Sequence, residues 1–225
     1  MDTSRTEKLL GTDGVAKLKN KNVLVVGTGG VGGITAEMLV RTGIGHLTIV
    51  DFDTISSSNI NRQVVALSTN VGKLKVEELS KRLLEINPQL QIKFVNQKLT
   101  AGNVAQLVTT DFDYVVDAID IVKDKTALIL YCLSHGISII SALGAGNKTC
   151  SPVYEVTDIF KTHNDGLAKV IRKNLREAGV KAHKVCYSCQ NRDVVEGCVG
   201  SVAWHPTACA CVIVSEVIKC LLKEN

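Results

Sequence analysis

Short apolar runs alternate with longer amphipathic stretches through the first two thirds of the chain. The apolar runs predict strands at residues 22–27, 46–51, 91–96, 113–118 and 137–141. The stretches between them predict helices at 31–43, 71–86, 101–109 and 123–135. Because parallel neighbours in a sheet are joined by crossover helices, this alternation predicts a Rossmann-like, doubly wound α/β fold with a mainly parallel sheet.

The pattern changes after Ala142, where the turn-rich stretch GAGNKTCSP interrupts it. Beyond this stretch we expect a C-terminal extension with strands at 153–156 and 184–187 and helices at 164–178 and 206–222. The last helix is rich in small and apolar residues, and Glu216 and Lys219 give it a polar edge. We therefore expect it in the core or at a subunit contact rather than in a membrane.

Length and composition suit a single globular domain over residues 1–225, since 45% of the residues are hydrophobic and 21% are charged. The start, MDTSRTEKLLGTDG, lacks the basic-then-apolar pattern of a signal peptide. No uninterrupted apolar run reaches the roughly 18 residues that a spanning helix needs. The chain is therefore expected to be a soluble, cytoplasmic protein.

The strand NVLVVG leads directly into the glycine loop GTGGVGG at residues 27–33, and an apolar helix follows. Gly27, Gly29, Gly30 and Gly32 let a backbone turn tightly and approach a phosphate, and the free N–H groups at a helix start attract negative charge. Asp51 ends the next strand, at the distance expected for a ribose hydroxyl. This arrangement predicts a nucleotide site.

Two cations and a carboxylate favour a nucleoside triphosphate over a nicotinamide cofactor as the ligand. Splitting a triphosphate requires positive charge near the leaving group, which Arg62 and Lys75 would supply, whereas a nicotinamide cofactor does not need it. Asp120 follows the fourth strand, where a carboxylate can hold Mg²⁺ against phosphates. Taken singly, these residues also fit a surface ion pair, a solvated helix position and a helix N-cap.

The motifs GTGGVGG, TIVDFDTISSSNINRQ, GKLK, INP and DAID resemble the ThiF/MoeB/HesA superfamily of ATP-dependent carboxylate-adenylating enzymes, relatives of the ubiquitin activators. The resemblance implies that ATP lies along Gly30 and Asp51 and that Asp120 organises magnesium. It also implies a homodimer in which Arg5 reaches into the neighbouring subunit's site. The remaining implied nucleotide contacts are Asp53, Ser58, Asn59, Asn61, Arg62, Gln63 and Lys75.

The C-terminal segments SALGAGNK, YEVTDIFKTHNDGLAKVIRKNLREAGVK and KVCYS are similar to the tRNA threonylcarbamoyladenosine dehydratase branch. This resemblance implies adenylation of the carboxylate on the modified tRNA base and cyclisation with loss of water. Residues 1–142 would then bind ATP, and 143–225 would face tRNA and the second subunit. Residues 161–184 carry seven positive and two negative side chains, which suits a phosphate backbone but also an ordinary solvated helix face.

Other functions stay open at this stage: activation of the C-terminal glycine of a sulfur-carrier or ubiquitin-like protein, a non-catalytic nucleotide-binding scaffold, and a nicotinamide-dependent dehydrogenase. The carrier-activating branches commonly have two C-x-x-C pairs for zinc, whereas this chain has one, Cys186 and Cys189. Packing accounts for the eight cysteines more simply than zinc binding or redox chemistry. The sequence leaves open whether a sulfur-transfer system takes part.

Overall fold

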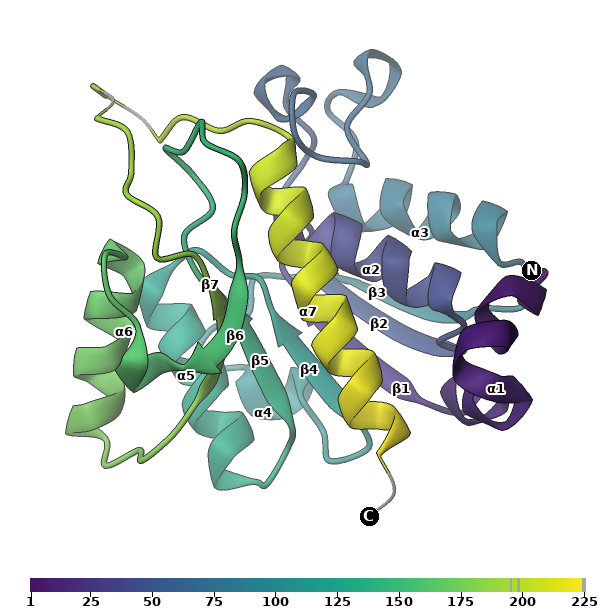
Figure 1. Ribbon diagram of the computed structural model, residues 1–225. Helices are drawn as coiled ribbons and strands as arrows, with labels where there is room; N and C mark the ends of the chain where they lie inside the picture. Colours follow the sequence, from purple (N-terminus) through teal and green to yellow (C-terminus); the bar gives the residue numbers. More distant parts are fainter. Residues whose placement is uncertain (195, 198, 224–225) are drawn as a thin grey trace.

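The chain folds around one seven-stranded sheet with helices on both faces (Figure 1). The structure is a computed structural model, and it describes residues 1–194, 196–197 and 199–223. The strands are β1 (Asn22–Val26), β2 (His46–Asp51), β3 (Gln91–Asn96), β4 (Tyr114–Asp117), β5 (Ile139–Ala142), β6 (Glu155–Asp158) and β7 (Lys184–Tyr187). The α-helices are α1 (Ser4–Lys19), α2 (Gly30–Thr42), α3 (Lys75–Ile86), α4 (Val104–Leu107), α5 (Val122–Ser134), α6 (Gly166–Glu177) and α7 (Trp204–Leu222). Three short 3-10 helices lie at Ser57–Asn59, Ser68–Asn70 and Ile159–Lys161.

The strand order is β3-β2-β1-β4-β5-β7-β6, and all neighbours are parallel except β6 and β7. This confirms the predicted doubly wound, mainly parallel α/β fold. The chain reverses its direction of winding at β1, because β2 pairs with one edge of β1 and β4 with the other. Ligands of such folds bind at this switch point, beyond the carboxyl ends of the strands.

Two hydrophobic cores lie on opposite faces of the sheet, and β1 contributes to both. Its alternate residues Val23 and Val25 pack with the core formed with α2, α3 and α7, and Leu24 and Val26 with the core formed with α5 and α6. All four are at most 2% exposed, as expected for a central parallel strand covered on both faces. Since β7 pairs with β5, the sheet continues across the predicted division at residue 142.

Helix α7 crosses the first of these faces, where it packs against α2, and Figure 1 shows it running diagonally over the sheet. By length and mean hydropathy it would be able to cross a membrane, but half of its most apolar window is buried within the protein. The position of α7 confirms the expectation of a core helix. Its apolar composition is explained by contacts with the sheet and its neighbours.

Except for two helices, the predicted elements are found within two residues of their expected bounds. The helix predicted at 71–86 begins at Lys75, because Leu74 is extended and pairs with Thr54. The helix predicted at 101–109 shortens to Val104–Leu107. Helix α1 was not predicted; it buries only Val15 and Leu18 and is kinked at Gly11, so its apolar pattern is weak.

His183 is buried just before β7 and contacts Ser141 of β5. Its ring is 3% exposed, Nε2 lies 2.8 Å from the Ser141 hydroxyl, and Nδ1 has no hydrogen-bond partner among the described residues. Burial, together with the charge of Lys125, lowers the pKa of His183 from 6.5 to about 3. His183 is therefore neutral in the folded protein at pH values where the unfolded chain is protonated.

Because only the unfolded state takes up this proton below pH 6.5, the stability contributed by neutral His183 is complete above that pH and falls as the pH drops toward 3. Between neutral pH and about pH 5 the loss should be about 1–2 kcal/mol. Urea denaturation of the wild type and His183→Gln at both pH values measures it. The variant should lose less stability on acidification, and equal losses in the two proteins would contradict the assignment.

Candidate functional site

A cavity of about 560 Å³ opens at the switch point of the sheet, beyond the carboxyl ends of β1, β2 and β4. Three segments that follow these strands line it: the glycine loop, the segment between β2 and α3, and the loop between β4 and α5. Residues 142–146 and the segment before α7 close the remaining side. The cavity therefore lies where the topology alone places a ligand.

The glycine loop is packed too closely to accept side chains. A Cβ at Gly27, whose φ is +86°, would lie 2.7 Å from the Ala118 carbonyl oxygen, and one at Gly32 would overlap the Gly27 carbonyl. Helix α2 starts at Gly30, and no side chain caps its first N–H groups. These free N–H groups and the helix dipole make the start of α2 suited to an anion such as phosphate.

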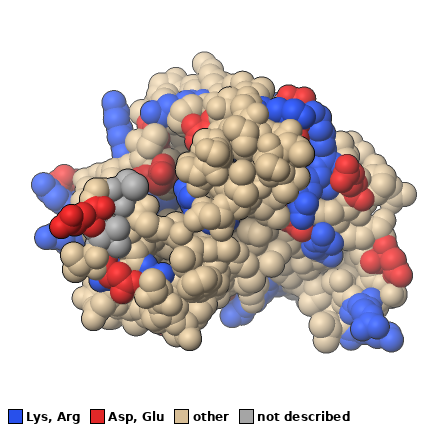
Figure 2. All heavy atoms as spheres, turned by 90° about the horizontal axis from the view of Figure 1, so that it is seen from above, with Lys and Arg blue, Asp and Glu red and all other residues tan. Residues whose placement is uncertain are grey.

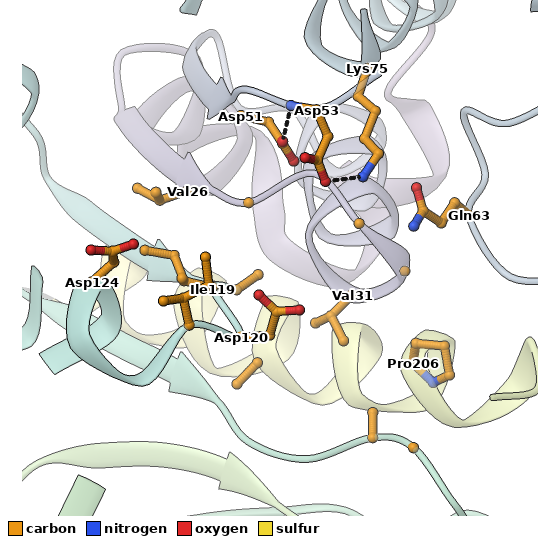
Figure 3. A pocket seen from close by; sticks show the side chains of 18 of the residues that line it. Val26, Val31, Asp51, Asp53, Gln63, Lys75, Ile119, Asp120, Asp124 and Pro206 are labelled. Atoms are coloured by element: carbon orange, nitrogen blue, oxygen red, sulfur yellow. Dashed lines mark hydrogen bonds and ion pairs between the residues drawn. The ribbon is translucent and has the colours of Figure 1, made fainter. Parts of the chain in front are cut away.

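Asp51 ties this loop to the end of β2. Its Oδ2 accepts hydrogen bonds from the Thr28 amide at 2.6 Å and the Thr28 hydroxyl at 2.9 Å. Its Oδ1 accepts one from the Asp53 amide at 2.9 Å, which Figure 3 shows. Asp51 also lines the cavity, and Oδ1 has a second lone pair available for a ligand hydroxyl.

The two predicted cations are held by different means. Lys75 begins α3, its side chain is only 7% exposed, and its Nζ lies 2.7 Å from Asp53 Oδ2 (Figure 3). Arg62 donates through Nη1 to the Ser58 carbonyl at 2.8 Å and to Asn61 Oδ1 at 2.9 Å. Both cations line the same cavity as the glycine loop.

The structure brings most of the sequence-predicted residues to this one cavity. Its lining includes Gly27, Gly29, Gly30, Asp51, Asp53, Asn59, Arg62, Gln63, Lys75 and Asp120. Gly32 lies beneath the loop, and Ser58 and Asn61 hold Arg62 instead of lining the cavity. Arg5 lies in the exposed first turn of α1 and does not line its own chain's cavity. The roles of these residues toward a nucleotide stay predictions.

Gln63 shows that part of the cavity wall lacks a hydrogen-bonding partner. The residue is 7% exposed, and its Oε1 is buried without a hydrogen-bond partner in the part of the chain that the structure describes. A buried acceptor of this kind costs about 1–3 kcal/mol unless a ligand or water donates to it. Among the described residues, no three Asp, Glu, His or Cys side chains gather as a metal site. Mg²⁺ needs no such cluster when phosphates supply its other ligands.

A buried ion pair beneath the β4–α5 loop was missed by the sequence analysis. Lys125 Nζ lies 2.9 Å from Asp117 Oδ2, and both side chains are fully buried. Lys125 also donates to the Ile119 carbonyl at 2.8 Å, and Asp117 Oδ1 accepts from the Ile119 amide at 3.0 Å. The pair therefore fixes the loop that carries Asp120. One sequence signal was available: Lys125 shares the buried face of α5 with Leu128 and Cys132.

The far side of the cavity comes from the C-terminal third and was also missed. Gly144, Arg192, Val199, Ser201 and Pro206 line it, and of these only Gly144 lies in a segment, SALGAGNK, that the sequence singles out. The Gly144 amide donates to Asp165 Oδ2 at 3.0 Å, which fixes the end of β5 against α6. Only the folding of the extension over the sheet brings these residues to the glycine loop.

The cysteines divide between the core and the surface. Cys132, Cys186 and Cys209 are buried, and the sulfur atoms of Cys186 and Cys209 lie 3.5 Å apart. Cys189 is exposed although it completes the C-x-x-C spacing with Cys186, so the two residues have different surroundings. Packing accounts for the three buried thiols, and burial raises the pKa of Cys132 to about 12. Cys198 lies outside the described residues.

Known proteins resemble this chain over nearly its whole length. The model of the ThiF family matches residues 3–225. The chain belongs to the ThiF family. The tRNA threonylcarbamoyladenosine dehydratases of Bacillus subtilis and Escherichia coli are each 40% identical to it, over 178 and 171 residues. These alignments cover 79% and 76% of this chain and 70% and 64% of the relatives' lengths.

A relative with a different description is less similar to this chain. The molybdopterin-synthase adenylyltransferase of Haemophilus influenzae is 34% identical over 178 residues, which are 78% of this chain and 72% of that protein. Among solved structures, the E. coli dehydratase in complex with AMP superposes with a TM-score of 0.93 at 33% identity. That match covers 97% of this chain and 93% of the other. The same enzyme in complex with ATP gives a TM-score of 0.92.

Loss of the buried ion pair should destabilise this ThiF-family fold. Lys125→Met removes the cation and leaves Asp117 charged and unpaired in the core, so the free energy of unfolding should fall by about 3–5 kcal/mol. Urea denaturation measures the change. The double variant Lys125→Met/Asp117→Asn should recover part of the loss, since it removes the unpaired charge. No recovery would show that packing around Lys125, rather than the charge, sets the cost.

Proposed function

We propose that this chain is an ATP-dependent tRNA threonylcarbamoyladenosine dehydratase. It adenylates the carboxylate of the modified base and closes it to cyclic threonylcarbamoyladenosine, with net loss of water. The observation that carries the proposal is the likeness over 97% of the chain to an E. coli enzyme of that name, solved in complex with ATP and AMP. The cavity at the switch point supplies the anion-binding loop and the cations that such a reaction needs.

In this proposal the nucleotide lies along the carboxyl ends of β1 and β2. The N–H groups at the start of α2 bind phosphate oxygens, and Asp51 accepts a hydrogen bond from a ribose hydroxyl. Lys75 and Arg62 face the triphosphate, and Gln63 donates or accepts there. Asp120 provides the carboxylate for Mg²⁺, which, when bound, neutralises phosphate charge.

The reaction proceeds in two steps, and neither step requires an enzyme thiol. A carboxylate oxygen of the substrate attacks the α-phosphorus of ATP, and the bond to pyrophosphate breaks; Arg62 and Lys75 stabilise the charge on the leaving pyrophosphate. A nitrogen of the same substituent then attacks the activated carbonyl carbon, loses its proton and displaces AMP. The oxygen removed from the carboxylate leaves with AMP, so the nucleoside loses one water in total.

The active protein is a homodimer in this proposal, with Arg5 contributing to the neighbouring subunit's site. Arg5 is exposed and lies outside its own cavity, as a residue that acts on a partner would. The segment between β2 and α3 exposes Ile60, Leu67 and Val71, which are 42%, 54% and 46% exposed. Figure 2 shows a broad surface without charged side chains at the molecule's upper face, with Lys and Arg at its margins. Such a surface suits a protein contact.

The proposed tRNA-binding surface excludes two of the seven cations in residues 161–184, because these two have partners within the protein. Lys184 is paired with Glu216 of α7 at 2.6 Å, and Arg172 donates to the Thr162 carbonyl at 2.7 Å. The cations left exposed in this segment are Lys161, Lys169, Lys173, Arg176 and Lys181. We further propose that the enzyme works in the cytoplasm.

The decisive experiment incubates the purified protein with ATP, Mg²⁺ and tRNA that carries threonylcarbamoyladenosine, and then weighs the released nucleoside by mass spectrometry. Loss of one water is expected. An unchanged nucleoside, together with ATP–pyrophosphate exchange that a carrier protein stimulates, would favour the adenylyltransferase function instead.

The same assay tests Lys75, with Lys73 as a matched control. Lys75→Ala should lower the rate of ATP consumption at least about 100-fold, because removal of a transition-state cation costs several kcal/mol. Lys73→Ala should keep most of the activity, since its side chain is 56% exposed and lies outside the cavity. Equal effects of the two substitutions would contradict the site. Thermal unfolding checks that both variants are folded.

The basic face of α6 is tested by tRNA binding at several salt concentrations. Lys169→Ala/Lys173→Ala should weaken binding and reduce the slope of log affinity against log salt by about 0.7–0.9 per lost phosphate contact. The charge-matched control Lys93→Ala/Lys219→Ala removes two exposed cations from other elements and should change neither quantity by as much. If both pairs act alike, only net charge matters and α6 is not the contact surface.

A further inference from the structure

A buried carboxylate at one end of the cavity has no role in the mechanism above. Asp124 lies in the first turn of α5, lines the cavity and is 4% exposed. Its Oδ2 accepts no hydrogen bond from the residues described. Lys98 Nζ lies 3.3 Å from this oxygen, within ion-pair distance but not aligned as a hydrogen bond. The carboxylate therefore has a counter-charge while its capacity to accept hydrogen bonds goes unused.

Asp124 lies where it would contact the nucleobase of a bound nucleotide rather than a phosphate. In Figure 3, Asp124 lies at one end of the cavity beside Val26 and Ile119, whereas Gln63 and Pro206 lie at the other end. The start of α2 belongs to the second end, since a Cβ at Gly30 would lie 3.1 Å from Pro206, and Figure 3 shows Lys75 on the side of Gln63. Asp51 lies between the two ends at the place of the ribose. A nucleotide so arranged directs its base toward Asp124.

The walls around Asp124 suit a flat aromatic ring. Apolar side chains at or just beyond the ends of β1 to β4 line the cavity, and they are Val26, Val50, Phe52, Leu99, Ile119 and Ile121. Figure 3 shows Val26 and Ile119 beside Asp124. Lys98 lies over the Phe52 ring, with its Nζ 5.6 Å from the centroid, while it pairs with Asp124. The cation thus links the ends of β2 and β3 to α5 at the rim of this apolar space. A ligand here meets apolar faces and a single acidic acceptor.

We propose that Asp124 accepts a hydrogen bond from the exocyclic amine of adenine and thereby selects ATP over GTP; this inference rests on the ATP-binding function proposed above. A deprotonated carboxylate can only accept hydrogen bonds. Adenine presents an amine donor at the position where guanine presents a carbonyl oxygen. Guanine bound in the same orientation would place its carbonyl oxygen, a second acceptor, against the buried carboxylate, and a site built for a donor rejects such a ligand strongly.

The test pairs a change in the ligand with a change in the protein. Equilibrium binding to the full chain is measured by calorimetry, with Mg²⁺ and either ATP or purine riboside triphosphate, which lacks only the amine. For the wild type, loss of the amine should weaken binding about tenfold or more, as for a hydrogen bond to a charged group. For Asp124→Leu the two ligands should bind alike, because no acceptor remains for the amine.

Two further variants distinguish the effect of the Asp124 acceptor from the effect of its ion pair with Lys98. Lys98→Met removes the ion pair but keeps the acceptor, so it should still prefer ATP about tenfold. Asp124→Asn can donate through Nδ2, so its preference for ATP over GTP should shrink; it also replaces Asp124→Leu if that variant does not fold. An equal loss on amine removal in wild type and Asp124→Leu would overturn the inference while ATP binding stands. Failure of the wild type to bind ATP would overturn the proposed function as well.

Discussion

The main chain at the β1–α2 turn lies so close to itself and to the end of β4 that no side chain fits between them. A Cβ at Gly32 would overlap the Gly27 carbonyl, and one at Gly27 would meet Ala118. This close approach lets α2 start directly above the switch point, with its uncapped N–H groups beside the cavity. The other groups of the site line the same cavity as that helix start.

Charged residues lie in two places near the start of α2: beneath the cavity and at its wall. Beneath the cavity, the fully buried pair of Lys125 and Asp117 fixes the β4–α5 loop through hydrogen bonds to Ile119. At the cavity wall, Asp51 and Asp53 hold Thr28 and Lys75. The buried pair is costly to form and has no exposure to a ligand, so its value lies in loop geometry rather than in net stability. The pairs at the wall are those that a ligand can reach.

The C-terminal extension completes the site instead of forming a second unit. Strand β7 joins the parallel sheet beside β5, and β6 closes the edge in the antiparallel direction. This arrangement carries residues 142–146 and Arg192 to the side of the cavity opposite the glycine loop. Likeness to dehydratases of the ThiF family extends over this region, since the structural match covers 97% of the chain. One side of the cavity is thus built by the last third of the sequence.

The sequence by itself determined the fold class, the strands and the ends of β1 and β2, because apolar periodicity and glycine spacing are local signals. It also indicated Asp51, Arg62, Lys75 and Asp120 as residues of one site, and the structure brings all four to one cavity. It missed α1, whose apolar face is weak, and it joined Lys184 to a basic cluster although Glu216 neutralises it. Only the tertiary structure decided the burial of Asp124 beside Lys98 and the placement of Arg192 at the cavity, because their surroundings come from residues distant in the chain.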